Sequence, residues 1–233
     1  MTKKGDWHRQ LEALMQSLEG KERQRLLLHS CCAPCSSHCL DLLSSCFDIT
    51  VFYYNPNITE KAEYSLRVAE QKRLLAELGE DLGVKLGFAE GAYEPERFLR
   101  TVKGLENSPE GGERCEKCFE LRLEETARYA KEHGFKLFTT TLTISPLKNA
   151  DLLNTLGCGI AEAHGLDYLT SDFKKRNGYK HSIELSKKYG LYRQDYCGCA
   201  FSKAERERQK KESDTERACE TGGNTGSASE PGK

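Results

Sequence analysis

The sequence predicts an α/β fold with a mostly parallel sheet and flanking helices. Segments whose apolar residues follow helical spacing alternate with short apolar segments that are rich in β-branched and aromatic residues. The 233 residues are enough for one sizeable core, and 37% hydrophobic with 30% charged residues suits a soluble globular protein. Alternation of this kind is typical of βαβ units, which place parallel strands in one sheet.

The first half of the chain predicts three helices and two strands. Residues 1–24 form a helical lead, because Trp7, Leu11 and Leu18 recur at helical spacing. A short apolar strand follows at Leu26–His29, then a helix over 40–46. ITVFYY at 49–54 is the second strand. After the NPNI loop, in which a proline prevents continuation, a long helix covers 60–78.

The second half repeats the alternation. Strands are predicted at 84–88, 137–143 and 167–170, and helices at 95–102, 115–133, 150–164 and 182–189. Glycines follow the last two of these helices, at positions where a left-handed C-cap is favourable. Residues 203–233 are charged and then rich in Gly, Ser and Thr, so we expect a disordered tail. The predicted organisation is a lead over 1–24, one catalytic domain over 25–202 and this tail.

Composition excludes several classes of protein. A net charge of −1 gives no overall field that would draw the chain to nucleic acid. The opening residues MTKKGDWHRQ carry no apolar signal region, and no segment approaches the ~18 apolar residues of a membrane helix. We therefore expect a cytoplasmic, reducing location without membrane attachment. In that location eleven cysteines indicate metal ligands or redox thiols in preference to disulfides.

Cys31 and Cys32 follow the first predicted strand directly. Neighbouring side chains of a strand point to opposite faces, so both sulfurs can serve one centre only where the strand breaks into a turn. Pro34 enforces that break and also restricts Ala33. The pair is suited to a metal or cluster at the carboxyl edge of the sheet, where α/β proteins bind ligands. The alternative is a pair of buried cysteines that act as small apolar groups.

Cys115 and Cys118 form a C-x-x-C motif at a predicted helix start. Their spacing places both sulfurs on one face, and the helix dipole favours thiolates there, with Arg114 and Lys117 adding positive charge. Alone, the motif also fits a redox dithiol or half of a zinc site. Together with the first pair it offers four thiolates, which suit zinc or an iron–sulfur cluster. An adjacent C-C pair makes a poor zinc knuckle, which favours the cluster.

Cys197 and Cys199 form a third pair, in which Gly198 permits the backbone to bend. A disulfide across one residue is strained, so the pair is interpreted as a switchable dithiol or as ligands of a second metal. Two unconnected thiols are the alternative. Cys35 either adds a ligand at the first turn or packs. The remaining cysteines are assigned to the core or, for the last one, to an inert tail position: Cys39, Cys46, Cys158 and Cys219.

Other candidate groups have a structural and a functional interpretation each. Tyr53, Tyr54 and Asn55 end the second strand and either stack on a base or pack. The basic stretch 174–181 either contacts nucleic acid or is a solvated face. His29 is expected to be a packed histidine. Neither G-x-x-x-x-G-K-[ST] nor G-x-G-x-x-G occurs, so ATP or NAD dependence is not supported.

Five motifs in order carry a family resemblance: LLHSCCAPCS, YYNPNI, ERCEKCFELRL, TTTLTISPLKN and GLYRQDYCGC. Together they resemble the epoxyqueuosine reductases of the QueH type, over about Leu26–Phe201. The joint pattern of C-C, C-x-x-C and C-G-C is specific, whereas any one of its pieces is not. The resemblance implies a fold similar to adenine nucleotide α-hydrolase-like (HUP) domains with metal-binding cysteine insertions and without ATP chemistry.

The same resemblance implies the chemistry. A [4Fe–4S] cluster would be bound by Cys31, Cys32, Cys115 and Cys118. Cys197 and Cys199 would form a redox-active pair or help to hold one additional iron, for which Cys35 is a further candidate ligand. The reaction would remove the epoxide oxygen of epoxyqueuosine at the wobble position of a tRNA with a GUN anticodon, the last step of queuosine synthesis. It needs two electrons from a low-potential donor and two protons, and Tyr196 is a hypothetical proton donor.

Three rival functions use the same cysteines. The first is a metal-free thiol–disulfide oxidoreductase that uses Cys115 and Cys118 or Cys197 and Cys199. The second is a zinc-stabilised RNA-binding module. The third is a tRNA-thiolating enzyme, against which the absence of an ATP loop counts. Iron and sulfide analysis of anaerobically purified protein separates the first two from the cluster enzyme.

Overall fold

A computed structural model describes the chain from residue 6 to residue 222, and its side chains up to residue 213. Within this part the strands are β1 Gln24–His29, β2 Phe47–Tyr53, β3 Gly87–Glu90, β4 Leu137–Thr140 and β5 Asp167–Tyr168. The helices are α1 Trp7–Leu18, α2 Ala33–Leu43, α3 Lys61–Leu82, α4 Pro95–Thr101, α5 Glu113–Glu132, α6 Ala150–His164, α7 Gly178–Lys188 and α8 Ala200–Gly222, with a 3₁₀ turn, η1, at Thr141–Ile144.

The described strands form one sheet in the order β3-β2-β1-β4-β5, and every neighbouring pair is parallel. The predicted α/β fold with a parallel sheet is thus confirmed. β1 lies in the centre, where His29 is in register with Phe52 of β2 and Thr140 of β4. Because β2 follows β1 on one side and β4 joins it on the other, the connections diverge between β1 and β4. Open α/β sheets bind ligands beyond the carboxyl ends of strands at such a point.

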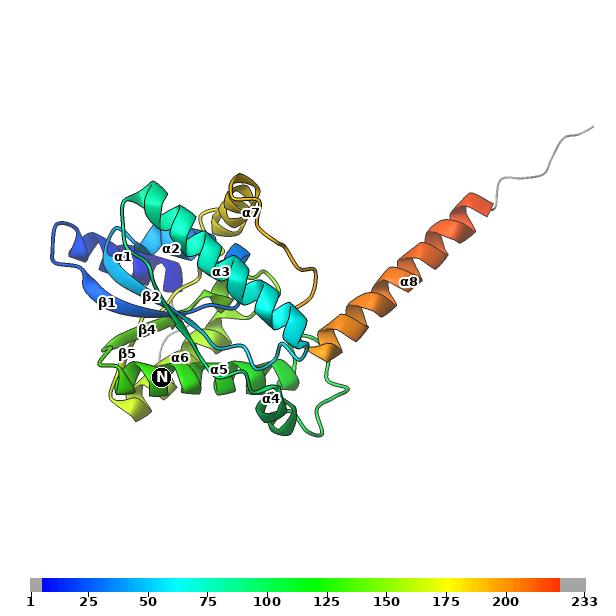
Figure 1. Cartoon of the computed structure of the whole chain (residues 1–233). Helices are drawn as coiled ribbons and strands as arrows, with labels where there is room; N and C mark the ends of the chain where they lie inside the picture. Colours follow the sequence, from blue (N-terminus) through cyan, green and yellow to red (C-terminus); the bar gives the residue numbers. More distant parts are fainter. Residues whose placement is uncertain (1–5, 223–233) are drawn as a thin grey trace, which may run out of the picture.

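Helices cover both faces of the sheet (Figure 1). α1, α2, α3 and α7 lie on one face, and α4, α5 and α6 on the other. The central strand contributes to both layers because successive side chains alternate. Leu26 and Leu28 pack with the first layer, while Leu27 packs with residues of α5 and α6 in the second.

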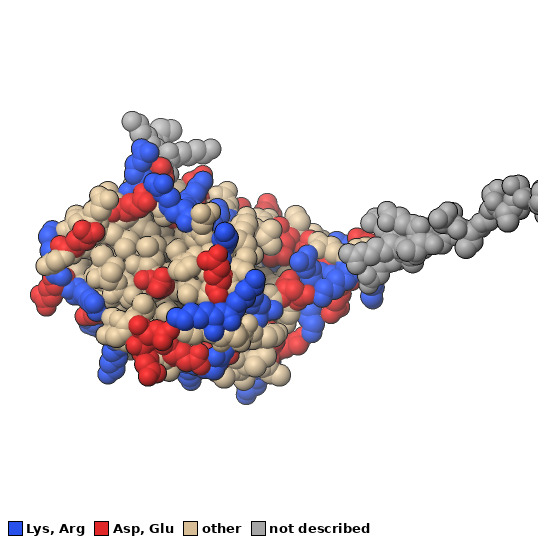
Figure 2. Space-filling model, turned by 90° about the horizontal axis from the view of Figure 1, so that it is seen from above, with Lys and Arg blue, Asp and Glu red and all other residues tan. Residues whose placement is uncertain are grey.

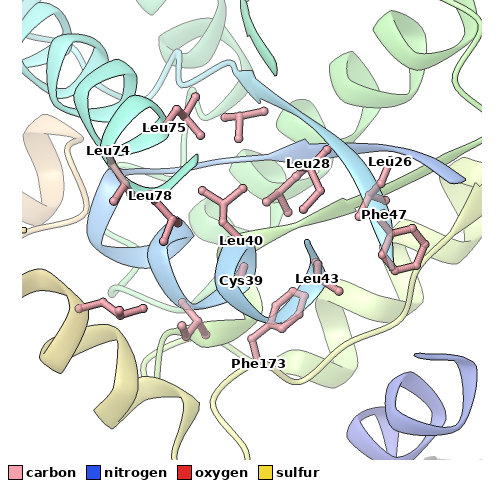
Figure 3. Packing of buried hydrophobic residues seen from close by; sticks show 14 of the residues in the cluster. Leu26, Leu28, Cys39, Leu40, Leu43, Phe47, Leu74, Leu75, Leu78 and Phe173 are labelled. Carbon is pink, nitrogen blue, oxygen red and sulfur yellow. The ribbon is translucent and has the colours of Figure 1, made fainter. Parts of the chain in front are cut away.

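The first layer is an aliphatic core built around α2 (Figure 3). Leu40 and Leu43 of α2 lie between the strand residues Leu26 and Leu28 and the α3 residues Leu74 and Leu78. Each of these six side chains has at most 1% of its surface exposed. Burial of one leucine stabilises a fold by roughly 1.5–3 kcal/mol, so this layer anchors the helix that follows the first cysteines.

Among the element boundaries that differ from the prediction, two bear on the site. α2 begins at Ala33 and not near residue 40, because Pro34 occupies the first turn of the helix, where its fixed φ is favourable and its missing N–H costs nothing. β4 ends at Thr140, and the predicted strand to residue 143 continues instead as η1, whose start is capped by the Thr140 hydroxyl. Both differences lie at the carboxyl edge of the sheet.

The expectation of disorder from residue 203 is wrong for residues 203–222, which continue α8. Glu, Lys, Arg and Gln dominate this segment and are good helix formers, and pairs such as Arg208 and Glu212 lie one turn apart. Most of α8 extends away from the body of the molecule (Figure 1). Residues 223–233 and the side chain of Cys219 lie outside the described residues.

Charges are mixed on the surface. On the face shown in Figure 2, basic and acidic side chains are interspersed, as a net charge of −1 leads one to expect. No helix among the described residues is long and apolar enough to cross a membrane.

Candidate metal centre

The first group of cysteines lies where β1 leads into α2. Cys31 and Cys32 precede the helix and Cys35 lies in its first turn, and we call these three residues the turn cysteines. Their three sulfurs all lie within 4.8 Å of one another. The adjacent sulfurs of Cys31 and Cys32 are 3.8 Å apart. They converge because the strand has ended at His29 and the extended Cys32 is the N-cap of α2. The predicted break of the strand therefore produces a preformed group of three sulfurs that could hold a metal.

The neighbouring strands fix this turn. The backbone N–H of Cys31 donates to Thr141 Oγ1 at 3.3 Å, and that hydroxyl approaches the Cys31 sulfur at 3.5 Å. On the β2 side, Asn55 Nδ2 donates to the carbonyl of Ser30 at 2.9 Å. Thr141 follows β4 and Asn55 follows β2, so the turn is held by residues that follow the two strands paired with β1.

The second group comprises Cys115, Cys118, Cys197 and Cys199, which we call the closing cysteines. The first two lie in the opening turns of α5, and the last two in the segment that leads into α8. All four line one narrow pocket. Cys118 and Cys199 are buried in a small apolar cluster with Phe98. The predicted helix start at C-x-x-C is confirmed, and the chain brings two distant pairs together.

The backbone at Cys197 is held from the side of β2 and α3. Its carbonyl accepts hydrogen bonds from Asn57 Nδ2 at 3.4 Å and from Arg67 Nη1 at 3.3 Å. Gly198 adopts φ +115°, a conformation that residues with a side chain rarely take. A Cβ at Gly198 would lie 2.8 Å from Ile58 and 3.1 Å from Arg67. Glycine is therefore required between the two cysteines.

The two groups meet across a cleft. All three turn cysteines line an open cavity of about 610 Å³, which Cys197 and Lys148 also line. Cys197 and Lys148 line the narrow pocket of the closing cysteines as well. All six sequence-predicted ligand and redox cysteines, together with Cys35, thus surround one continuous site. In the part of the chain that the structure describes, only the turn cysteines form a close group of three potential ligands.

The turn cysteines favour one thiolate. Hydrogen bonding from Cys32, and then from Cys35, lowers the pKa of Cys31 well below its usual range, and Lys148 and Arg122 act in the same direction. The interaction with Cys31 raises the pKa of Cys32, and the pKa of Cys35 is raised for the same reason. One anionic sulfur with two protonated neighbours is a nucleus for binding a thiophilic metal.

Burial is the main effect on the thiols of Cys115, Cys118 and Cys199. It raises the pKa of Cys118 to about 12 and also raises the pKa values of Cys115 and Cys199. The Gly111 N–H donates to the Cys115 sulfur at 3.2 Å and opposes this rise only partly. The helix start that was expected to favour thiolates is therefore outweighed by desolvation. These thiols need a bound cation to lose their protons.

Two cations lie among the sulfurs. Although burial lowers the pKa of Lys148, the thiols of Cys197, Cys31 and Cys35 together raise it. Arg122 is 1% exposed, and the same kind of interaction with Cys118, Cys197 and Cys31 raises its pKa against the effect of burial. Arg122 Nη1 is a buried donor that finds no hydrogen-bond partner among the described residues. Cations with unused donors fit an anionic centre such as a thiolate-ligated cluster.

Several of the other sequence candidates make structural contacts. Tyr53 and Tyr54 are fully buried in the core and are not available to stack on a base. The basic stretch 174–181 is largely ion-paired, through Lys174 with Asp172, Arg176 with Glu12, and Lys180 with Glu184. His29 is packed as expected, and Cys39 and Cys46 are core residues. Cys158 is only half-buried, in α6, which differs from the expected core position.

Residues that the sequence interpretation missed form the walls of this site. Arg122 follows Cys118 by four residues, and helical spacing could have placed it on the same buried face. Lys148 belongs to the TTTLTISPLKN motif, but nothing local in the sequence marks it as a neighbour of cysteines. Arg67 and Asn57 give no such signal either, because their partner Cys197 is 130 and 140 residues away.

Comparison with known proteins decides the family. The family profile "Epoxyqueuosine reductase QueH" matches residues 26–205. The chain belongs to the QueH family. It is 45% identical over 183 residues to the epoxyqueuosine reductase QueH of Staphylococcus epidermidis, covering 78% of this chain and 77% of that protein. It is similar to QueH of Streptococcus pyogenes at 44% identity (77% and 71% covered) and of Thermotoga maritima at 36% (78% and 91% covered). The sequence resemblance is confirmed.

Proposed function

We propose that this chain is an epoxyqueuosine reductase, which removes the epoxide oxygen of epoxyqueuosine at the tRNA wobble position and leaves queuosine, the last step of its synthesis. Membership of the QueH family supports this function. The observation that carries it is the cleft on which turn and closing cysteines converge. A cluster of thiols at the carboxyl edge of the sheet suits reductive chemistry, and no phosphate-binding glycine loop occurs in the sequence.

The proposed cofactor is a [4Fe–4S] cluster held by Cys31, Cys32, Cys115 and Cys118. Four thiolates are the ligand set that such a cluster requires. The lowered pKa of Cys31 and the cations Arg122 and Lys148 favour an anionic centre in this cleft. When bound, the cluster would supply electrons one at a time to the reaction. Hydrogen bonds from Thr141 and Gly111 to sulfur would orient two of the four ligands.

Cys197 and Cys199 are proposed as the second redox group, either as a dithiol that forms a disulfide or as ligands of one additional iron. Epoxide reduction to an alkene and water consumes two electrons and two protons, so a second redox group beside a one-electron cluster is useful. Cys197 lines both the cleft and the narrow pocket, as that role requires. Cys35 lies within the turn group and is a candidate ligand of the additional iron.

The same cleft is proposed to receive the substrate nucleotide of a tRNA with a GUN anticodon. Wobble bases lie in a single-stranded loop, from which a base can be turned out into a pocket. A cavity of about 610 Å³ falls within the range of small-molecule sites. Its walls carry cations for phosphates and aromatic or apolar side chains for bases: Lys148, Arg193, Arg206, Tyr179, Tyr196, Pro146 and Leu147. Leu147 is 73% exposed and is therefore free to contact a base.

The proposed fold family and the proposed cytoplasmic location agree with this function. The strand order β3-β2-β1-β4-β5 supports the likeness to HUP domains, with cysteines where a nucleotide-binding enzyme of that fold would place glycines. A reducing cytoplasmic location suits both the free thiols and a tRNA substrate. The electron donor would be an external low-potential carrier.

The test is anaerobic turnover. Full-length protein, reconstituted with iron and sulfide, is incubated with epoxyqueuosine-containing tRNA and a low-potential reductant, and the digested nucleosides are analysed by mass spectrometry. We expect the epoxyqueuosine signal to be replaced by that of queuosine, which has one oxygen fewer. Colour, iron and sulfide of the same sample are measured before the reaction.

Three results would reject parts of the proposal. No conversion by a cluster-replete sample rejects the reaction. Conversion without iron or sulfide would favour the metal-free oxidoreductase. One zinc per chain, with unfolding on chelation, would favour an RNA-binding module. As matched control we suggest Cys158→Ser, a half-buried thiol in α6, which should convert the substrate like the wild type.

A further inference from the structure

Arg122 is a buried cation whose hydrogen-bond partners are all neutral. Its Nη2 donates to Asn55 Oδ1 at 2.5 Å, and its Nε lies 3.3 Å from His29 Nε2. Burial, followed by the Arg122 charge, lowers the pKa of His29 to about 3, so the imidazole is uncharged at neutral pH. The third guanidinium nitrogen, Nη1, is buried and has no geometric hydrogen-bond partner among the described residues, although the Cys118 thiol is near enough to raise the pKa of Arg122.

Arg67 provides the contrast. It is also buried, at 2% exposure, and it also reaches the site, through the carbonyl of Cys197. However, its Nε forms an ion pair of 2.7 Å with Glu63, whose side chain is 12% exposed. None of the ion pairs between described residues includes Arg122. An uncompensated buried charge is strongly unfavourable, so Arg122 requires a counter-ion.

The groups around Arg122 that can become anionic are thiols. Cys118 lies one helical turn before it on α5, and Cys197 and Cys31 are the other two sulfurs whose charge acts on it. They come from both the turn and the closing cysteines. The guanidinium is therefore close enough to sulfurs of both groups to interact with them electrostatically, and two of these sulfurs, Cys31 and Cys118, are proposed cluster ligands.

We infer that Arg122 is the counter-ion of the cysteine-bound centre and sets its reduction potential. This inference rests on the proposed cluster and concerns a positioning residue, because Arg122 is not itself a ligand. A fixed positive charge in a low-dielectric site stabilises the more negative, reduced state more than the oxidised one. Arg122 thus raises the reduction potential and makes the centre easier for its electron donor to reduce.

The electron balance is simple. One electron passes from an external one-electron reductant to the centre, no bond is formed or broken, and the reductant is oxidised by one electron. Arg122 stays protonated throughout, because a guanidinium does not lose its proton in proteins. Its effect on the potential is therefore a charge effect that needs no proton transfer at this residue.

The experiment measures the potential and not turnover. Full-length protein is reconstituted anaerobically, and the reduced centre is followed by electron paramagnetic resonance during a titration with dithionite. Two variants neutralise the charge by different routes. Arg122→Gln removes it. Asn55→Asp places a carboxylate against Nη2 but gives up the amide donor to the Ser30 carbonyl, so its iron content is measured before its potential. We expect both to shift the potential to more negative values. Arg122→Lys keeps the charge and should stay near the wild type.

Arg128→Gln is the matched control, because Arg128 lies on the same helix but pairs with Glu125 and Glu132 away from the sulfurs. Its potential should equal that of the wild type. Unchanged potentials in both Arg122→Gln and Asn55→Asp would overturn the inference. So would loss of the centre from every variant at these two positions, since that result shows a structural role only. A wild-type protein that binds no cluster rejects the proposed cofactor instead.

Discussion

The turn cysteines and the closing cysteines are two ways to build half of a metal centre. Cys31, Cys32 and Cys35 come from five consecutive positions where β1 leads into α2, and their sulfurs lie within 4.8 Å of one another. The closing cysteines come from α5 and from a segment nearly eighty residues later, and they form no comparably tight group among the described residues. The first group is set by local backbone geometry, and the second by tertiary packing.

This difference between the two groups predicts different effects for substitutions among the turn cysteines and for substitutions around Cys197. A preformed group with one favoured thiolate can capture iron early. The closing group contains buried, protonated thiols, and Cys197 is held through its carbonyl by Asn57 and Arg67. Substitutions in the turn should therefore remove the centre itself, whereas changes around Cys197 should leave it in place and impair what it does.

The largest effect is expected for Cys31→Ser. Serine offers a hard, weakly acidic oxygen in place of the favoured thiolate, so the reconstituted protein should lose nearly all bound iron and sulfide together with turnover. Metal analysis and the visible spectrum measure the loss. Cys158→Ser, also at a half-buried thiol, should retain wild-type iron. Full iron in Cys31→Ser would show that the turn group is not the primary site.

Cys197→Ser should separate the two groups most clearly. We expect the cluster spectrum to remain while turnover falls by roughly 10²-fold or more, because the second redox group is lost and the four proposed cluster ligands are intact. Iron content and conversion of the tRNA are measured on the same preparation. A protein without the cluster would place Cys197 in the ligand set and contradict the assignment.

Gly198→Ala tests whether the backbone, and not only the sulfur, matters. A Cβ would meet Ile58 at 2.8 Å in a residue already at φ +115°, so the segment must shift and Cys197 with it. We expect turnover to fall about 10-fold with the iron content unchanged. Gly190→Ala is the control, since its φ is also positive, at +54°, but its Cβ would meet nothing within 4 Å. Equal losses in both variants would indicate a general backbone effect.

How far the sequence predicts this site depends on the same distinction. Strand order aside, alternating patterns predict most elements, and the turn after β1 follows from Cys31, Cys32 and Pro34 alone. Pro34 has one further role that the sequence does not predict, because it lies in the first turn of α2 as well as ending the strand. That Arg122 interacts electrostatically with cysteines of three segments, or that Lys148 lines both cavities, depends on packing across the sheet and has no local signature. For α8 the misleading signal was local: the charged composition suggested disorder, but the same residues have a high helix propensity and form a helix.

The smallest effect is expected at the joint between the two regions. His38 lies in α2, the helix that follows the first two turn cysteines, and His181 lies in α7, the helix that precedes Cys197 and Cys199. The Nδ1 atoms of the two histidines are 3.0 Å apart. Burial, then His181 and His8, lowers the pKa of His38 to about 4. An unfolded histidine titrates near pH ~6.5, so between that pH and about 4 the unfolded state binds more protons and stability falls as pH falls.

His38→Gln should remove this part of the pH dependence. In the wild type the contribution approaches about 1.4 kcal/mol per pH unit below pH ~6.5, because a one-unit difference in pKa corresponds to that free energy. Urea unfolding at several pH values measures the free energy of unfolding of both proteins, and the wild-type curve should be the steeper. If the free energies of unfolding of the two proteins depended on pH in the same way, His38 would bind protons in the folded state as readily as in the unfolded chain. The contact between α2 and α7 would then not be weakened by acid, and the two cysteine groups would keep their alignment at low pH.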